Sequence, residues 1–217
     1  MTDPAHPSDL ELAALIASKI CHDVISPVGA IYNGIEILND DDDAASQSYA
    51  LSVIKNVTQQ ASARLQFARF AFGAAGSAGA EIELDNARQI SEGLVEGNKH
   101  NLTWNGSAGT LPKNQVKLLL NMVACAVTAL PRGGEITVDI VGDHPKVDFV
   151  LRCRGRGARP PQYLSEFVDG TAEFDIDAMS IQAYYAWRLA QETGMAMSYA
   201  VNDDEEEVTL TVAAPTA

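Results

Sequence analysis

Residues 18 to 38 read SKICHDVISPVGAIYNGIEIL, and this stretch decides how the first third of the chain folds. Apolar residues recur in it at intervals of three and four, the spacing that places side chains on one face of an α-helix. The same run holds a histidine, His22, next to an aspartate, Asp23, with a proline, Pro27, five positions after the histidine. A polar site therefore interrupts an otherwise apolar helix.

The apolar pattern continues on both sides and predicts two long helices, over residues 9–39 and 43–72. Ser8 or Asp9 can cap the first helix, and the aspartates after Asn39 supply the turn and the next cap. Two helices joined by a short polar loop form an antiparallel hairpin, which cannot bury an apolar stripe on each helix by itself. We therefore expect a homodimer that forms a four-helix bundle. The stripes are Leu12, Ile16, Ile20, Val24, Val28, Ile31, Ile35 and Leu38, then Ile54, Val57, Ala61, Leu65, Ala68 and Phe72.

His22 falls on the wrong face of its helix for a core residue. At about 100° per residue, position 22 lies nearly opposite the mean direction of the first apolar stripe. An exposed imidazole with small neighbours suits reaction with a partner protein, although a plain surface or structural role is the alternative. The residues on that side are small or polar: Ser18, Lys19, Ser26, Gly29 and Asn33.

Pro27 predicts a kink one turn after His22. A proline inside a helix removes one backbone hydrogen bond and clashes with the preceding turn, at a cost of about 3 kcal/mol. The bond that it removes involves a carbonyl in the turn of Asp23. The kink either serves the polar site or only helps the two helices to wrap around each other.

A metal site is the competing chemical interpretation of a His-Asp pair, as in HD-type phosphohydrolases. Such sites need further histidines on neighbouring helices. The other histidines, His6, His100 and His144, occur in a tail and two loop-like stretches. Adjacent helical residues also point about 100° apart, so His22 and Asp23 alone would chelate poorly. We therefore expect no metal site.

The sequence changes character after residues 73–79, GAAGSAG, which read as a linker. Short alternating units follow, so we expect a helical-hairpin domain over residues 1–76 and an α/β sandwich over 80–217, an α+β protein of two domains. Strands are expected at 81–84, 101–104, 133–142, 146–155, 195–201 and 207–213, and helices at 86–97, 112–130 and 177–192.

The composition excludes several partners and compartments. The formal net charge of −14 argues against nucleic acid and anionic membrane surfaces, which need clustered Lys and Arg. No run approaches the roughly 18 uninterrupted apolar residues of a membrane span, and the polar start is no secretory signal. Cys21, Cys125 and Cys153 lack CxxC spacing and indicate reduced thiols. We expect a cytoplasmic protein.

The motif HDVISP, residues 22 to 27, resembles the H-box H-[DE]-x-x-[NST]-P of sensor histidine kinases, which lies on the first helix of their dimerising hairpin. In that family the histidine is phosphorylated on a ring nitrogen. The resemblance implies that His22 is the phosphoacceptor and that Asp23 orients or deprotonates its ring. Lys19 could assist with phosphate charge. Reasonable partner contacts are Ser18, Ser26, Gly29 and Asn33.

Residues 80–213 resemble the ATP-binding domain of the same kinases, but with nucleotide contacts replaced. Asn121 matches the first asparagine of the kinase pattern, whereas Cys125 stands where the magnesium ligand belongs, and a thiol binds Mg²⁺ poorly. Arg154 replaces the aspartate that recognises adenine, and guanidinium offers only donors. No glycine occurs from Thr171 to Thr193, so the phosphate-binding loop is missing. We therefore expect no ATP binding and no cofactor of the protein's own.

A phosphoacceptor hairpin followed by a degenerate ATP-binding domain resembles the ChpT type of dimeric histidine phosphotransferase. The resemblance implies a relay in which the receiver of a hybrid kinase, CckA in that family, phosphorylates His22. The phosphoryl group then passes to response-regulator receivers, those of CtrA and CpdR, and the receiver supplies Mg²⁺. The alternatives are a non-catalytic dimeric scaffold or kinase inhibitor and an ATP-dependent histidine kinase.

Overall fold

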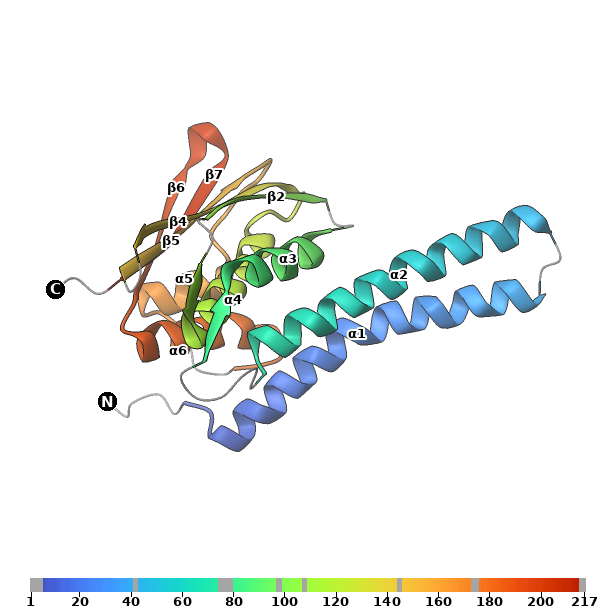
Figure 1. Cartoon of the computed structure of the whole chain (residues 1–217), viewed down its shortest axis with the longest axis horizontal. Coiled ribbons are helices and arrows are strands. Elements are labelled where there is room, and N and C mark those ends of the chain that lie inside the picture. Colours follow the sequence, from blue (N-terminus) through green and yellow to red (C-terminus); the bar gives the residue numbers. More distant parts are fainter. Residues whose placement is uncertain are drawn as a thin grey trace.

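A helical hairpin projects from a compact α/β part (Figure 1). The computed structural model describes residues 6–40, 43–73, 80–96, 99–106, 109–143, 146–172 and 176–214. The hairpin consists of helices α1 (Asp9–Asp40) and α2 (Ala44–Ala71), close to the predicted ranges. Most of the predicted linker, residues 74–79, lies outside the described residues, and the division into two domains stays a prediction.

Side-chain caps explain where the two helices begin. The amide of Ser8 donates to the Glu11 carboxylate at 2.8 Å, and the amide of Glu11 donates back to the Ser8 hydroxyl at 3.3 Å. This reciprocal pair satisfies two amides that the first turn leaves without helical partners. At the start of α2, the Asp43 carboxylate accepts from the amide of Ser46 at 3.0 Å. The sequence prediction of caps at both positions is confirmed.

The two helices approach each other closely at Gly34. A Cβ atom built there would lie 2.6 Å from Cγ1 of Ile54, and Gly34 and Ala50 are both buried. Pro27 is also buried, and α1 continues through it as a single helix. Small residues at the contact therefore set the spacing of the hairpin.

A long apolar surface of the hairpin stays uncovered in the single chain. On α1 the side chains of Ile25, Val28, Tyr32 and Ile35 are between 46 and 71% exposed. Tyr49, Leu51 and Leu65 on α2 are also exposed. By length and composition α1 could cross a membrane, but a bundle helix passes the same test, so one such helix is weak evidence for a membrane span.

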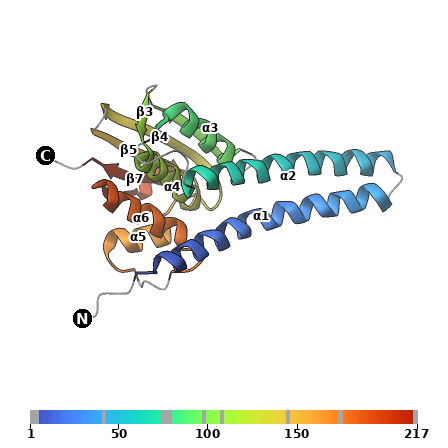
Figure 2. The same ribbon diagram turned by 60° about the horizontal axis from the view of Figure 1, so that its bottom comes forward.

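The α/β part contains one mixed sheet with helices over one face (Figure 2). Its strand order is β2-β4-β5-β7-β6, in which only the β2–β4 pair is parallel, and β1 and β3 form a separate two-stranded sheet. The α/β sandwich predicted from the sequence is confirmed. Its elements are β1 (Glu81–Glu83), α3 (Leu84–Val95), β2 (His100–Asn105), β3 (Thr110–Pro112), α4 (Lys113–Ala129), β4 (Gly134–Asp143), β5 (Lys146–Arg154), α5 (Gln162–Asp169), α6 (Ile181–Thr193), β6 (Ala196–Asn202), a 3-10 turn (Asp203–Glu205) and β7 (Glu207–Ala213).

Three details differ from the sequence prediction. Strand β3 and helix α5 were not predicted. Helix α6 begins at Ile181 instead of residue 177, because the Asp177 carboxylate accepts from the amides of Met179 and Ser180 at 2.8 Å each. A side chain that binds nearby amides in this way stabilises a turn in competition with the helix.

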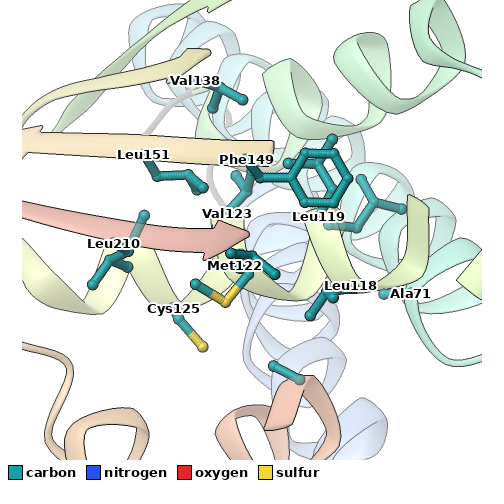
Figure 3. Close-up of a cluster of buried hydrophobic side chains, with 14 of the residues drawn as sticks. Ala71, Leu118, Leu119, Met122, Val123, Cys125, Val138, Phe149, Leu151 and Leu210 are labelled. Atoms are coloured by element: carbon teal, nitrogen blue, oxygen red, sulfur yellow. The ribbon is translucent and has the colours of Figure 1, made fainter. Parts of the chain in front are cut away.

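The core lies between the sheet and α4. Buried side chains of the strands, Phe149, Leu151 and Leu210 among them, face Leu118 and Met122 of α4 (Figure 3). Along β5 buried and more exposed residues alternate, as expected for a strand with one covered face. Ala71, at the end of α2, is also fully buried in this cluster. The hairpin is therefore packed into the core of the α/β part.

Enlarging Gly34 should destabilise the protein through the hairpin contact. We expect Gly34→Leu to lower the free energy of unfolding by about 1–3 kcal/mol, because the new side chain collides with Ile54. Gly29→Leu is the matched control, since nothing lies within 4 Å of a Cβ atom there, and it should raise stability by up to about 1 kcal/mol. Urea unfolding monitored by circular dichroism measures both, and equal effects would contradict the close contact.

Candidate functional site

His22 lies on the exposed side of α1, as the sequence predicted. Its side chain is 66% exposed, and it borders a cleft of roughly 350 Å³ between the hairpin and the α/β part. The predicted contact residues Ser18, Ser26, Gly29 and Asn33 are exposed on the same helix. Lys19 is half-buried. The histidine is therefore open to a partner while it stands beside a cleft that the sequence did not predict.

Asp23 connects His22 to Lys19. Its Oδ1 atom lies 3.3 Å from Nδ1 of His22, and Nζ of Lys19 donates to the same carboxylate at 2.5 and 2.6 Å. An ionised carboxylate only accepts hydrogen bonds, so this contact favours the tautomer with the proton on Nδ1. The lone pair then resides on Nε2. The structure thus brings together the three residues that the sequence singled out.

Arg64 of α2 completes this site and was not predicted from the sequence. Its Nη1 donates to the backbone carbonyl of Asp23 at 2.7 Å. The antiparallel pairing of the two helices could have indicated this contact. Gly34 of α1 lies against Ile54 of α2, so a residue about ten positions before Gly34 lies near one about ten positions after Ile54, as Asp23 and Arg64 do. The local sequence around residue 64 carries no such signal.

The cleft beside His22 combines an apolar lining with a polar rim. Both the hairpin and the α/β part contribute side chains, so the cleft depends on how these two parts pack. The apolar lining residues include Ile20, Val24, Phe67, Phe72, Leu94, Val127 and Met179, and the polar ones Arg64, Thr128 and Gln182.

Asn121 joins the hairpin to the α/β part. It is fully buried, and its amide nitrogen donates to the carbonyls of Ala71 at 3.2 Å and Lys117 at 2.7 Å. Its amide oxygen accepts from Gln182 of α6. One side chain therefore ties the end of α2 to α4 and α6. Residues before α1 add a second attachment, because the ring of His6 lies against those of Tyr184 and Trp187 on α6.

Comparison with known proteins identifies the family of the chain. The family model described as "Histidine phosphotransferase C-terminal domain" matches residues 84–205. A protein of Brucella abortus (strain 2308), "Protein phosphotransferase ChpT", is 45% identical over 199 residues, which make up 91% of this chain and 94% of the relative. The chain belongs to the histidine phosphotransferase family. It is a phosphotransferase of the ChpT type, as its resemblance implied.

A solved structure supports the same assignment for the fold. The "1.7 Angstrom Structure of a Bacterial Phosphotransferase" superposes on this phosphotransferase with a TM-score of 0.89 at 41% sequence identity. The match covers 96% of this chain and 98% of the solved one. Hairpin and α/β part together therefore form a known phosphotransferase architecture.

Two residues at positions that resemble nucleotide contacts of histidine kinases, Cys125 and Arg154, are buried or paired in this phosphotransferase. Burial raises the pKa of the Cys125 thiol to about 12, and burial together with Glu207 does the same for Cys153. Arg154 forms ion pairs with Glu205 at 2.8 Å and Glu207 at 3.2 Å. Among the described residues no group of three or more His, Cys, Asp or Glu side chains could hold a metal ion.

The three cysteines should differ sharply in reactivity. At pH 8 we expect iodoacetamide to alkylate Cys21 in the native protein, because that thiol is exposed. Cys125 and Cys153 should stay unmodified, since both are buried and their raised pKa keeps the thiolate scarce. Mass spectrometry should find one modification in the native protein and three in urea. The native Cys21→Ser variant should carry no modification. Rapid labelling of Cys125 in the native protein would contradict this packing.

Proposed function

We propose that this phosphotransferase works in a His-Asp phosphorelay, with His22 as the residue that carries the phosphoryl group. The observation that carries the proposal is the exposed imidazole whose Nδ1 faces Asp23 at 3.3 Å. Nδ1 holds the proton, so Nε2 is the nucleophile. An exposed nucleophile can reach the phosphorylated aspartate of a docked receiver domain.

In the transfer step, the lone pair of Nε2 attacks the phosphorus of an aspartyl phosphate on the donor receiver. The bond between phosphorus and the aspartyl oxygen breaks, and its electron pair returns to the donor carboxylate. The phosphorylated ring becomes cationic, and Asp23 stabilises it through the Nδ1 proton. In the second transfer, a carboxylate oxygen of another receiver's aspartate attacks the same phosphorus, the bond between phosphorus and Nε2 breaks, and its electron pair returns to the His22 ring. The receivers supply Mg²⁺, since phosphoryl transfer depends on positioning and charge stabilisation.

Lys19 has a supporting role in this proposal. Its ammonium group lies 2.5 Å from the Asp23 carboxylate, and this contact holds the carboxylate in place beside the ring. Lys19 also adds positive charge near the incoming phosphoryl group. The exposed residues Ser18, Ser26, Gly29 and Asn33 would then contact the docked receiver.

The partners we propose are receiver domains in the cytoplasm. The donor is the receiver of a CckA-like hybrid histidine kinase, and the acceptors are the receivers of CtrA-like and CpdR-like response regulators. The family assignment supports kinase and regulator partners in general. The net charge of −14 opposes nucleic acid and anionic membranes as further partners.

We further propose that no nucleotide binds to the α/β part. The Asn121 amide is already used to join three helices. Cys125 offers a neutral thiol, and Arg154 is paired with two glutamates. Groups that have taken on structural contacts are not available for ATP and Mg²⁺, so the phosphoryl group must come from another protein.

A phosphotransfer assay tests this function. We expect label from a phosphorylated receiver to reach the wild-type protein and to be lost completely in His22→Ala, because no other residue replaces the imidazole. His100→Gln is the control for labelling elsewhere; it keeps a donor for the Leu130 carbonyl that the His100 ring contacts at 2.9 Å. Label from ATP alone would favour a histidine kinase. Unchanged signalling in a cell that carries His22→Ala would favour a scaffold.

The exposed apolar surface of the hairpin supports a homodimer that closes a four-helix bundle. We expect Tyr32→Glu, in the centre of that surface, to convert the dimer to a monomer, because charged groups are costly to bury at an apolar interface. Val201→Glu changes an equally apolar, exposed residue of β6 and should leave the dimer intact. Sedimentation velocity measures both variants. A wild-type protein that sediments as a monomer at micromolar concentration would refute the bundle.

A further inference from the structure

Pro27 leaves the backbone carbonyl of Asp23 without its usual helical partner. In an α-helix each amide donates to the carbonyl four residues earlier, and proline has no amide hydrogen. The carbonyl of Asp23 is the one that residue 27 would otherwise serve. Nη1 of Arg64 lies 2.7 Å from this oxygen and replaces the missing donor from the neighbouring helix.

We propose that Arg64 is a positioning residue for phosphotransfer, which it assists by holding the turn of α1 that carries His22 and Asp23. The inference rests on the proposed role of His22 as phosphoacceptor. A guanidinium gives a stronger, charge-assisted hydrogen bond than a backbone amide does. Because Arg64 belongs to α2, this hydrogen bond holds the turn of α1 against the second helix, which a backbone amide of α1 could not do.

Two sets of contacts act on Asp23 at the same time. Its backbone oxygen is held by Arg64, and its carboxylate is held by Lys19 at 2.5 Å. With both contacts present, Oδ1 lies 3.3 Å from Nδ1 of His22. If the backbone of this turn shifts, the carboxylate moves with it and loses its alignment with the ring.

Arg64 acts through Asp23 and not on the phosphoryl group itself. The side chain is half-buried in the wall of the cleft, and its Nη1 donates to the Asp23 carbonyl. A receiver that docks over His22 meets the exposed side of α1. The loss of Arg64 should therefore slow the transfer step and leave receiver binding unchanged.

Single-turnover transfer from a phosphorylated receiver, measured over a range of receiver concentrations, tests the inference. We expect Arg64→Met to reduce the maximal rate by about 10- to 100-fold without changing the half-saturating concentration. Arg64→Lys keeps one donor of similar reach and should restore most of the rate. Arg69→Met is the matched control, because Arg69 is exposed on the same helix and packs over Phe70.

A double variant separates positioning from simple stabilisation. Pro27→Ala restores an amide for the Asp23 carbonyl, so Pro27→Ala/Arg64→Met should recover the melting temperature that Arg64→Met lowers by about 5 °C. We expect the double variant to remain slow in transfer, since the bond from α2 is still missing. A double variant as fast as wild type, or an unimpaired Arg64→Met, would overturn the role of Arg64 alone. A wild-type protein that accepts no label would overturn the proposed function and this inference with it.

Discussion

The structure depends on the constraint that a two-helix hairpin cannot bury an apolar stripe on each of its helices. Near the base of the hairpin, the α/β part covers these stripes, and Ala71 becomes part of its core. Farther out, residues such as Tyr32 stay exposed and available for a second copy of the chain. His22 lies where the two kinds of surface meet, beside the cleft that separates hairpin and α/β part. In the proposed dimer, the same constraint therefore sets both the assembly of two chains and the position of His22.

Polar side chains also stabilise the packing within and between the two parts. Asn121 ties the end of α2 to α4 and α6, and Arg154 holds the tip of the β6–β7 hairpin through Glu205 and Glu207. Both residues occupy positions that resemble nucleotide contacts of histidine kinases. In the proposed function no nucleotide binds here, so these side chains are available to stabilise one arrangement of the two parts.

Most of the fold could be predicted because long periodic segments carry strong local signals. Helices α1 and α2 and strands β4 and β5 were predicted to within about one residue at each end. Strand β3 was missed because its three residues become a strand only by pairing with β1. The start of α6 was misplaced because Asp177 stabilises a turn with its own side chain. In both cases a specific contact determined the secondary structure of a short segment more strongly than its intrinsic propensity did.

The sequence by itself determined the hairpin and the exposed face of His22, because helical periodicity relates residues that are close along the chain. The resemblance to the H-box implied that Asp23 acts on the His22 ring. The sequence also indicated which positions that resemble kinase nucleotide contacts carry other residue types, since residue identity alone decides whether a side chain can bind Mg²⁺ or accept a hydrogen bond. Only the tertiary structure decided that Arg64 serves the carbonyl freed by Pro27, that Asn121 joins three helices and that a cleft opens beside His22. Each of these features needs residues far apart in sequence to meet, and no local pattern encodes which of them will do so.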